Sequence, residues 1–376
     1  MEYRYIDKLG VKLSLLGFGC MRLPKLDNGE IDEREAERLL DCAILQGVNY
    51  LDTAYFYHNG KSEAFVGRVI QKYPRDILHI ATKLPMSKVR SLEQAKTIFN
   101  DQLERLKVDY FDFYLLHALD KARWDCAVQT GIVDYLEDLQ AQGKIRFFGF
   151  SFHDQYDVFE EILRYREWDF CQMQLNYLDT EHQQGLRGYR LAEELDVPVV
   201  VMEPVKGGAL AQLPKEIADE FMSVNPQQSL ASWALRWVGS LPQVKVILSG
   251  MSSYEQVEDN LAVFSPFVSL NEEEVALVSR VANAIRSKVK NGCTGCEYCM
   301  PCPFGVNIPE CFKAWNELAM FQNSAKAKQM YYNMMAESER AFACRGCGSC
   351  EKKCPQKIKI RQDLFRVAVD LAPNKL

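Results

Sequence analysis

Residues 111–117 read FDFYLLH, a short apolar run that ends in a histidine. Seven similar runs occur in the first 290 residues, separated by amphipathic stretches with helical periodicity. The eight strand candidates are Leu15–Cys20, Asn49–Asp52, Leu78–Lys83, Phe111–His117, Arg146–Phe150, Phe170–Leu175, Val199–Met202 and Val244–Leu248. The helical patterns between them include Asp32–Gln46, Ser91–Leu106, Ile132–Gln142, Asp154–Tyr165 and Gln228–Val238. This alternation predicts an α/β protein with a (β/α)8 TIM barrel, and Tyr3–Lys12, with Gly10 at its turn, predicts a hairpin that caps the barrel floor.

The length and composition are those of a globular protein. The chain has 376 residues, of which 48% are hydrophobic and 26% charged, enough for one large fold and an appendage of about 100 residues. No apolar run approaches the roughly 18 residues that a membrane span needs, and the N-terminus lacks the apolar segment of a secretory signal. We therefore expect a cytoplasmic protein without a membrane partner. The net charge of −6 argues against a nucleic-acid partner, and no GxGxxG motif supports a Rossmann site.

Cysteines are concentrated near the C-terminus. Of 13 cysteines, eight form the blocks Cys293-x2-Cys296-x2-Cys299-x2-Cys302-Pro303 and Cys344-x2-Cys347-x2-Cys350-x3-Cys354-Pro355. Disulfides are a poor explanation in a reducing cytosol. The spacing is typical of two [4Fe–4S] clusters, in which the fourth cysteine of each block ligates the other cluster. This rule predicts one cluster on Cys293, Cys296, Cys299 and Cys354, and another on Cys344, Cys347, Cys350 and Cys302. Structural zinc is the alternative.

The cysteine blocks define a second domain. We expect a barrel over residues 1–285 and a smaller, mainly helical, ferredoxin-like two-cluster domain over 286–376, with a helix at Pro309–Met320. From residue 291 onward there are 12 Lys/Arg and 8 Asp/Glu, and we interpret this surplus as an offset to the cluster charge. Of the remaining cysteines, we expect four to be small buried residues, Cys20, Cys42, Cys126 and Cys171, and Cys311 to be structural.

Polar residues lie at the predicted ends of three consecutive strands. These are Asp52, Lys83 and His117, and Tyr57 follows in the loop after Asp52. Taken singly, each has an ordinary interpretation, such as a helix cap, a solvated lysine, a core histidine or a surface aromatic. Because barrel chemistry lies at the C-terminal ends of the strands, all four together predict an active site.

The chain resembles the aldo/keto reductase family at specific segments. They are Gly47–Ala54 with Tyr57 and Ser62-Glu63, Ala81–Lys83, Leu106-x2-Asp109-Tyr110-x-Asp112-x-Tyr114–His117, Lys144–Arg146 with Gly149–Ser151, and Ile247-x-Ser249–Ser252 leading to Gln256 and Asn260. The resemblance spans roughly residues 1 to 285, and the tail is similar to the ferredoxin-like extension of one subgroup. It implies an NAD(P)H-dependent carbonyl reductase in which Tyr57 is the general acid. Lys83 is expected to lower the pKa of Tyr57, Asp52 to hold Lys83, and His117 to orient the substrate.

The same resemblance implies a cofactor, NADP(H) or NAD(H). Ser151 and Gln172 match positions that contact the nicotinamide carboxamide, and Met202 stands where many relatives stack a tyrosine. Other implied contacts, mostly near the adenosine phosphate, are Gly19, Met21, Ser249, Gly250, Ser252, Gln256 and Asn260. Gln256 replaces an arginine often found near the 2′-phosphate, which weakens the expected preference for NADPH over NADH.

The substrate and the role of the clusters stay open at this stage. We expect a small carbonyl substrate between the loops Leu119–Trp124 and Lys206–Pro214. Tyr55, Phe56 and Trp124 could form an aromatic rim that favours an apolar or aromatic compound, or else pack beneath the loops. Three functions fit the sequence. They are a carbonyl reductase with a structural or regulatory tail, a ferredoxin-linked reductase that receives single electrons from a redox partner protein, and a non-catalytic nucleotide-binding redox sensor.

Overall fold

The computed structural model describes residues 1–373, and the chain divides into two compact units. The first comprises Met1–Leu210 and Ala231–Val275, and the second comprises Ala211–Leu230 and the chain from Ala276 onward. Helix α11 (Glu272–Arg286) begins in one unit and ends in the other. The expected boundary between residues 285 and 286 therefore stays a prediction, close to the end of this helix.

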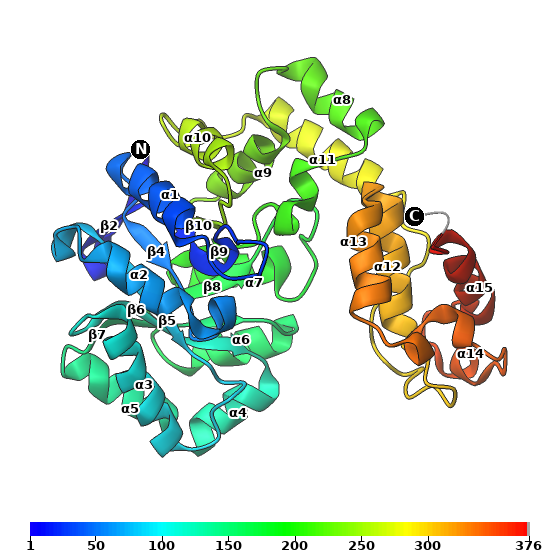
Figure 1. The fold of residues 1–376 in the computed structure, drawn as a ribbon, viewed down its shortest axis with the longest axis horizontal. Helices are drawn as coiled ribbons and strands as arrows, with labels where there is room; N and C mark the ends of the chain where they lie inside the picture. Colours follow the sequence, from blue (N-terminus) through cyan, green and yellow to red (C-terminus); the bar gives the residue numbers. More distant parts are fainter. Residues whose placement is uncertain (374–376) are drawn as a thin grey trace. The chain divides into compact units, whose positions relative to one another are not determined.

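The first unit is a closed barrel of eight parallel strands in the order β10-β3-β4-β5-β6-β7-β8-β9 (Figure 1). This confirms the predicted (β/α)8 fold, and every strand candidate is a strand whose ends differ by at most a few residues. The strands are β3 (Leu16–Gly19), β4 (Tyr50–Asp52), β5 (His79–Leu84), β6 (Phe111–Leu119), β7 (Ile145–Phe152), β8 (Phe170–Gln174), β9 (Val199–Met202) and β10 (Val244–Ser249).

A hairpin precedes the barrel, as predicted. Strands β1 (Tyr3–Ile6) and β2 (Val11–Ser14) pair antiparallel, and Gly10, at φ 60°, supplies the left-handed turn residue. Leu13 of β2 packs in one buried cluster with the inward-facing side chains of the barrel, among them Tyr50 and Phe113. The ring centres of Tyr50 and Phe113 are 5.0 Å apart. Apolar side chains therefore fill the lower barrel, and strand alternation leaves Asp52 and Lys83 one layer above them.

Helices cover the outside of the barrel (Figure 1). They are α1 (Glu33–Leu45), α2 (Ser62–Ile70), α3 (Leu92–Leu106), α4 (Lys121–Gln129), α5 (Ile132–Ala141), α6 (Tyr156–Tyr165), α7 (Gly185–Glu194), α9 (Leu230–Gly239) and α10 (Tyr254–Val263). The five predicted helical patterns all lie within this set. Capping side chains mark where several of these helices begin. The Asp32 and Ser91 side chains accept hydrogen bonds from the backbone N–H groups of Glu35 and Gln94, at the starts of α1 and α3.

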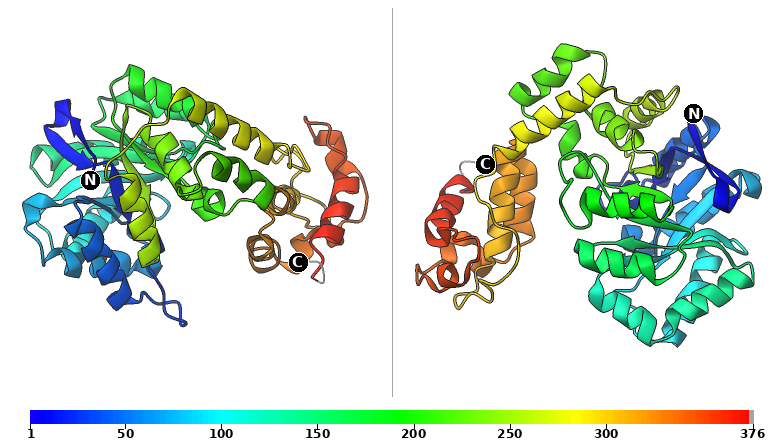
Figure 2. Two further views of the ribbon diagram at one scale, coloured as in Figure 1. Left: turned by 90° about the horizontal axis from the view of Figure 1, so that it is seen from above. Right: turned by 180° about the vertical axis from the view of Figure 1, so that it is seen from behind.

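The second unit is helical, and within its described residues no strand occurs. Its helices are α8 (Lys215–Val224), the end of α11, α12 (Ile308–Phe321), α13 (Ser324–Lys328), α14 (Ser349–Lys353) and α15 (Ile360–Asp370). The predicted helix at Pro309–Met320 is α12, which packs against α13 and α15 (Figure 2). Cys311 is fully buried in the resulting core beside Phe312 and Trp315, as expected for a small apolar residue. Among the described helices, none has the length and apolarity needed to cross a membrane.

Candidate active site and cysteine pockets

Neighbouring strands bring the predicted tetrad together. Asp52 ends β4, Lys83 lies in β5, His117 lies in β6, and Tyr57 begins a short turn at Tyr57–Gly60. The Lys83 Nζ donates to Asp52 Oδ1 at 2.6 Å and to the carbonyl oxygen of Thr53 at 2.7 Å. The same Nζ lies 5.2 Å from the centre of the Tyr57 ring. The four side chains thus form one cluster above the apolar barrel core.

Asp52 and Lys83 form an ion pair away from solvent. The side chains are 3% and 1% exposed. Burial raises the pKa of Asp52, opposed by Lys83. Burial alone would lower the pKa of Lys83, but Asp52 and then Tyr57 outweigh it, so the pKa of Lys83 is raised. Lys83 is therefore a fixed positive charge at neutral pH, and Asp52 Oδ2 is buried without a hydrogen-bond partner among the described residues.

The electrostatics of Tyr57 differ from the expectation. Burial, the largest influence, raises the pKa of Tyr57, while the Lys83 ammonium lowers it by charge attraction. The net direction is upward, so the expectation that Lys83 brings the pKa of Tyr57 below its usual value of about 10 is wrong for the free protein. The expectation counted the neighbouring cation and omitted desolvation of the phenolate. At neutral pH, Tyr57 therefore holds its proton.

A β-bulge orients His117. Pairing between β6 and β7 shifts between Leu116 and Leu119, and Ala118 inside this irregular segment has φ 54°. The Ala118 N–H donates to Ser151 Oγ of β7 at 2.7 Å. A bulge beside a site re-aims a side chain, and a left-handed alanine is a strained conformation that the surrounding structure must hold. No motif or composition signal predicts this bulge.

His117 contacts two aromatic rings. Its ring lies edge-on to Tyr57 at 6.1 Å between centres and stacks on Phe56 at 5.1 Å. Burial, followed by the nearby Lys83 charge, lowers the pKa of His117 well below its usual value. The imidazole is thus neutral at physiological pH, and its Nδ1 is buried without a partner among the described residues.

The predicted aromatic rim is partly wrong. Trp124 is 2% exposed and packs against Tyr165 and Trp168, with ring centres 4.9 and 6.3 Å away. It belongs to the helix layer outside the barrel, because α4 turns its apolar side toward α6 and the strands. Tyr55 lies against Arg105, whose guanidinium carbon is 4.3 Å from the ring centre, whereas Phe56 contacts the tetrad by stacking on His117.

The candidate nicotinamide contacts are adjacent. Ser151 on β7 pairs in register with Gln172 on β8, and both are 2% exposed. Ser151 Oγ accepts from Ala118, which leaves its hydroxyl hydrogen available to a ligand. Gln172 Oε1 is buried without a hydrogen-bond partner among the described residues. A hydroxyl donor beside an unsatisfied amide fits the carboxamide of a nicotinamide, which offers one acceptor and one donor group.

The remaining cofactor candidates lie at the ends of β3, β9 and β10. Gly19 ends β3, Met21 lies in the short turn that follows it, and Met202 ends β9. Ser249 and Asn260 are hydrogen-bonded, with Asn260 Nδ2 donating to Ser249 Oγ at 2.6 Å. The remaining candidates are Gly250, Ser252 and Gln256, at the loop before α10. There the Ser252 N–H donates to Gln256 Oε1 at 2.8 Å.

One residue of this region was missed by the sequence reasoning. Arg22 packs closely against two glycines. A Cβ atom added at Gly250 would lie 3.1 Å from the Cβ of Arg22, and one added at Gly207 would lie 3.2 Å from the Arg22 guanidinium. Ser252 Oγ donates to the Arg22 carbonyl oxygen at 2.6 Å. Arg22 thus joins the loops after β3, β9 and β10, and its position beside Met21 was the available signal.

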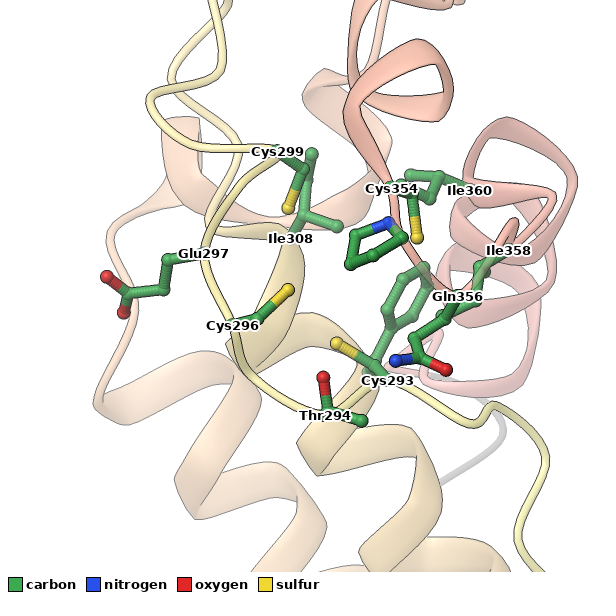
Figure 3. A pocket seen from close by; sticks show the side chains of 12 residues that line it. Cys293, Thr294, Cys296, Glu297, Cys299, Ile308, Cys354, Gln356, Ile358 and Ile360 are labelled. Carbon is green, nitrogen blue, oxygen red and sulfur yellow. The ribbon is translucent and has the colours of Figure 1, made fainter. Parts of the chain in front are cut away.

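The cysteines surround two pockets, and the blocks cross between them. The first pocket is lined by Cys293, Cys296, Cys299 and Cys354, whose sulfurs point into one space in Figure 3, whereas Glu297 points away. The second is lined by Cys302, Cys344, Cys347 and Cys350. Their empty volumes, with the space open to solvent, are similar, at about 320 and 310 Å³.

These groupings bear on the choice between iron–sulfur clusters and zinc. Among residues 1–373, no three His, Cys, Asp or Glu side chains are placed to ligate one ion. Four sulfurs spread around a pocket fit a cubane better than the tight tetrahedron of structural zinc. The scattered cysteines follow the expectation in part: Cys20 and Cys171 are buried, but Cys42 and Cys126 are only half-buried.

Comparisons with known proteins agree with this architecture. A sequence model of the aldo/keto reductase family matches residues 15–283, and one of a 4Fe–4S dicluster domain matches residues 292–358. The oxidoreductase YqkF of Bacillus subtilis is 28% identical over 322 residues, covering 76% of this chain and 98% of YqkF. The NADH-specific methylglyoxal reductase of Escherichia coli is 25% identical over 320 residues, covering 73% of this chain and 96% of the reductase. The structure of aldo-keto reductase AKR11C1 from Bacillus halodurans in its holo form superposes with a TM-score of 0.63 and 29% identity, covering 75% of this chain and 96% of that one.

Proposed function

The chain belongs to the aldo/keto reductase family and is an oxidoreductase with a C-terminal 4Fe–4S dicluster domain, and from this premise we propose that it reduces an aldehyde or ketone with a nicotinamide cofactor. The observation that carries the proposal is the buried Lys83–Asp52 pair beside Tyr57 and His117. A buried ion pair costs desolvation energy and is weak as a source of stability. Its place at the strand ends is better explained by catalysis, which also argues against a non-catalytic nucleotide-binding sensor.

Each side chain has a distinct part in the proposed reduction. When bound, a reduced nicotinamide, NADPH or NADH, would be the source of the hydride for the carbonyl carbon. Tyr57 gives its phenolic proton to the carbonyl oxygen, which yields the alcohol, and later regains a proton from solvent. The Lys83 ammonium stabilises the tyrosinate as it forms, and Asp52 holds that ammonium in place. His117, being neutral, can donate one hydrogen bond to the carbonyl oxygen without competing as an acid.

The raised pKa of Tyr57 is compatible with this role. A general acid must hold its proton before the reaction, and the raised value ensures this at neutral pH. The Lys83 charge then matters most in the transition state, where negative charge reaches the phenol oxygen. Ser151 and Gln172 would bind the carboxamide, and Arg22 lies where a cation can meet the cofactor phosphates.

The matched pair Tyr57→Phe and Tyr55→Phe tests this assignment. Tyr55 is adjacent in sequence, and its ring lies against Arg105. With NADPH, NADH and a panel of aldehydes, Tyr57→Phe should lose turnover while Tyr55→Phe keeps it. Equal turnover in both variants would remove Tyr57 from the acid role. The choice between the two cofactors follows from the same measurements on the wild type.

We also propose that the two pockets hold [4Fe–4S] clusters on the eight lining cysteines. Each cluster stores and passes single electrons. The domain match and the crossed sulfur groups support this proposal, and iron, sulfide and visible absorbance on anaerobically purified protein test it. One cysteine of each pocket, Cys296 and Cys347, is exposed, which favours a ferredoxin-linked reductase as the second candidate function. That candidate predicts bleaching of the cluster absorbance when substrate is added without oxygen.

A further inference from the structure

Residues 345–359, which include α14 and end just before α15, carry unusual charge. Among the described residues, five of their exposed cations take part in no ion pair or side-chain hydrogen bond: Arg345, Lys352, Lys353, Lys357 and Lys359. The acidic groups nearby are already engaged. Glu351 pairs with Arg361 at 2.9 Å, and Asp363 accepts from Asn291 at 2.6 Å. We call these five residues the basic segment.

The basic segment runs past both pockets, and of its five residues only Arg345 lines one of them, the second. Arg345 and Arg361 line the second pocket, whose lining includes no carboxylate. The first pocket has one acidic lining residue, Glu297, and no Lys or Arg. The lining residues of the two pockets thus differ in charge, although both pockets present four cysteines.

The place of the four lysines changes the interpretation of the basic surplus. Charges that served only to offset the clusters would line the pockets. Lys352, Lys353, Lys357 and Lys359 line neither pocket and are exposed, so they create a positive field that reaches into solvent and attracts acidic partners. The sequence-based view that the surplus only compensates the clusters therefore does not account for where it lies.

Aromatic side chains accompany the charge. Phe304 lines the second pocket and is 45% exposed, and Phe342, two residues before Cys344, is 55% exposed. Exposed phenyl rings mixed with arginine are typical of protein–protein interfaces, where they supply contact area inside a charged rim. A nucleic-acid duplex would use the cations but has less need of these rings, because its bases are already paired and stacked.

We propose that the basic segment, with Phe304 and Phe342, is the docking surface for an acidic electron-carrier protein. The inference rests on the proposed assignment of clusters to the pockets. In the exchange, the reduced carrier loses one electron and the group in the second pocket gains it, with no bond made or broken. Opposite charges steer the carrier to this docking surface and hold it there briefly, as a short-lived redox complex requires.

Binding is tested on the full-length, cluster-loaded protein. The probe is an oxidised acidic [2Fe–2S] ferredoxin, so that no electron moves and calorimetry reports binding alone. Because two exposed charge pairs with the carrier would be lost, Lys352→Gln/Lys353→Gln should weaken binding about twofold to thirtyfold at low salt. The control Lys313→Gln/Lys328→Gln removes two charges from α12 and α13 and should leave the dissociation constant nearly unchanged. Equal weakening in both variants, or none in the first, overturns the proposal.

Small oxidants of opposite charge give a second measurement. Each takes one electron from dithionite-reduced protein. Oxidation by anionic ferricyanide should slow in Lys352→Gln/Lys353→Gln, and oxidation by cationic hexaamminecobalt(III) should accelerate. Rates that change in the same direction, or not at all, contradict the proposal.

Two controls separate the possible failures. Iron and sulfide are measured on the same samples, because a protein without clusters refutes the proposed function, whereas a loaded protein indifferent to the lysines refutes this inference alone. A mobility shift with duplex DNA that the same substitution abolishes, with unchanged ferredoxin binding, would assign the segment to nucleic acid and likewise overturn the proposal.

Discussion

Replacing Lys83 by methionine should destabilise the barrel, by an amount that depends on pH. The substitution keeps much of the side-chain volume and removes the ammonium 2.6 Å from Asp52 Oδ1. Breaking a buried pair by removing one partner costs about 3–5 kcal/mol. For a domain of this size, that is a fall in melting temperature of roughly 6–20 °C. Differential scanning calorimetry at pH 7 measures it.

The pH dependence follows from Asp52. In the wild type, burial raises the pKa of Asp52 and Lys83 opposes the rise. In Lys83→Met the opposing Lys83 charge is gone. Above about pH 4, Asp52 of the folded protein therefore keeps its proton, whereas Asp52 of the unfolded chain has lost it. Unfolded chains then hold fewer protons than folded ones, and the free energy of unfolding falls as pH rises from 4 toward 7. The loss relative to wild type should therefore be largest at pH 7 and smaller at pH 4.5.

A matched control isolates the buried pair. Lys88→Met makes the same change at an exposed lysine for which the described residues offer no ion pair, and its melting temperature should stay within about 2 °C of wild type, as surface substitutions do. The reasoning is refuted if Lys83→Met melts with the wild type at pH 7, or if its deficit is as large at pH 4.5.

Further outcomes are expected from the site and the pockets. Tyr57→Phe should lower kcat by roughly 10²–10⁴-fold and leave the dissociation constant of the cofactor within about twofold, as cofactor fluorescence would show. Because the pKa of Tyr57 is raised and that of His117 lies well below its usual value, kcat should stay flat from about pH 7 to 9 and fall at higher pH as Tyr57 loses its proton; a rise there would contradict the assignment. Gln172→Leu should weaken binding of both NADPH and NADH, measured by the same fluorescence, since it removes an amide with a buried, unsatisfied oxygen. Cys347→Ser should lose about half of the iron, because one pocket keeps all its sulfur ligands, whereas full iron content would exclude Cys347 as a ligand.

Periodicity and spacing predicted most of the fold and the site. The eight strands were predictable because each is a short apolar run between amphipathic helices, and a closed barrel aligns their C-terminal ends. That rule alone brought Asp52, Lys83 and His117 together. The cysteine grouping was likewise expected from local spacing and the crossing rule.

The errors arose where tertiary packing decides. Trp124 was placed at the mouth because its loop is there, but its helix turns it against Trp168. The pKa of Tyr57 depends on burial, which no local motif reports. The residue types around Ala118 do not predict the bulge there, because alanine seldom adopts the positive φ that Ala118 has.

The crossed cysteine pockets set an order for biosynthesis. The last barrel strand ends at Ser249, and the first pocket is not complete until Cys354 has been made, 105 residues later. The second pocket lacks its last cysteine until Cys350 has been made. Because domains fold from the N-terminus while the ribosome works, the barrel can close and present its tetrad before any iron is loaded, and a shortage of iron during translation would affect the C-terminal domain first.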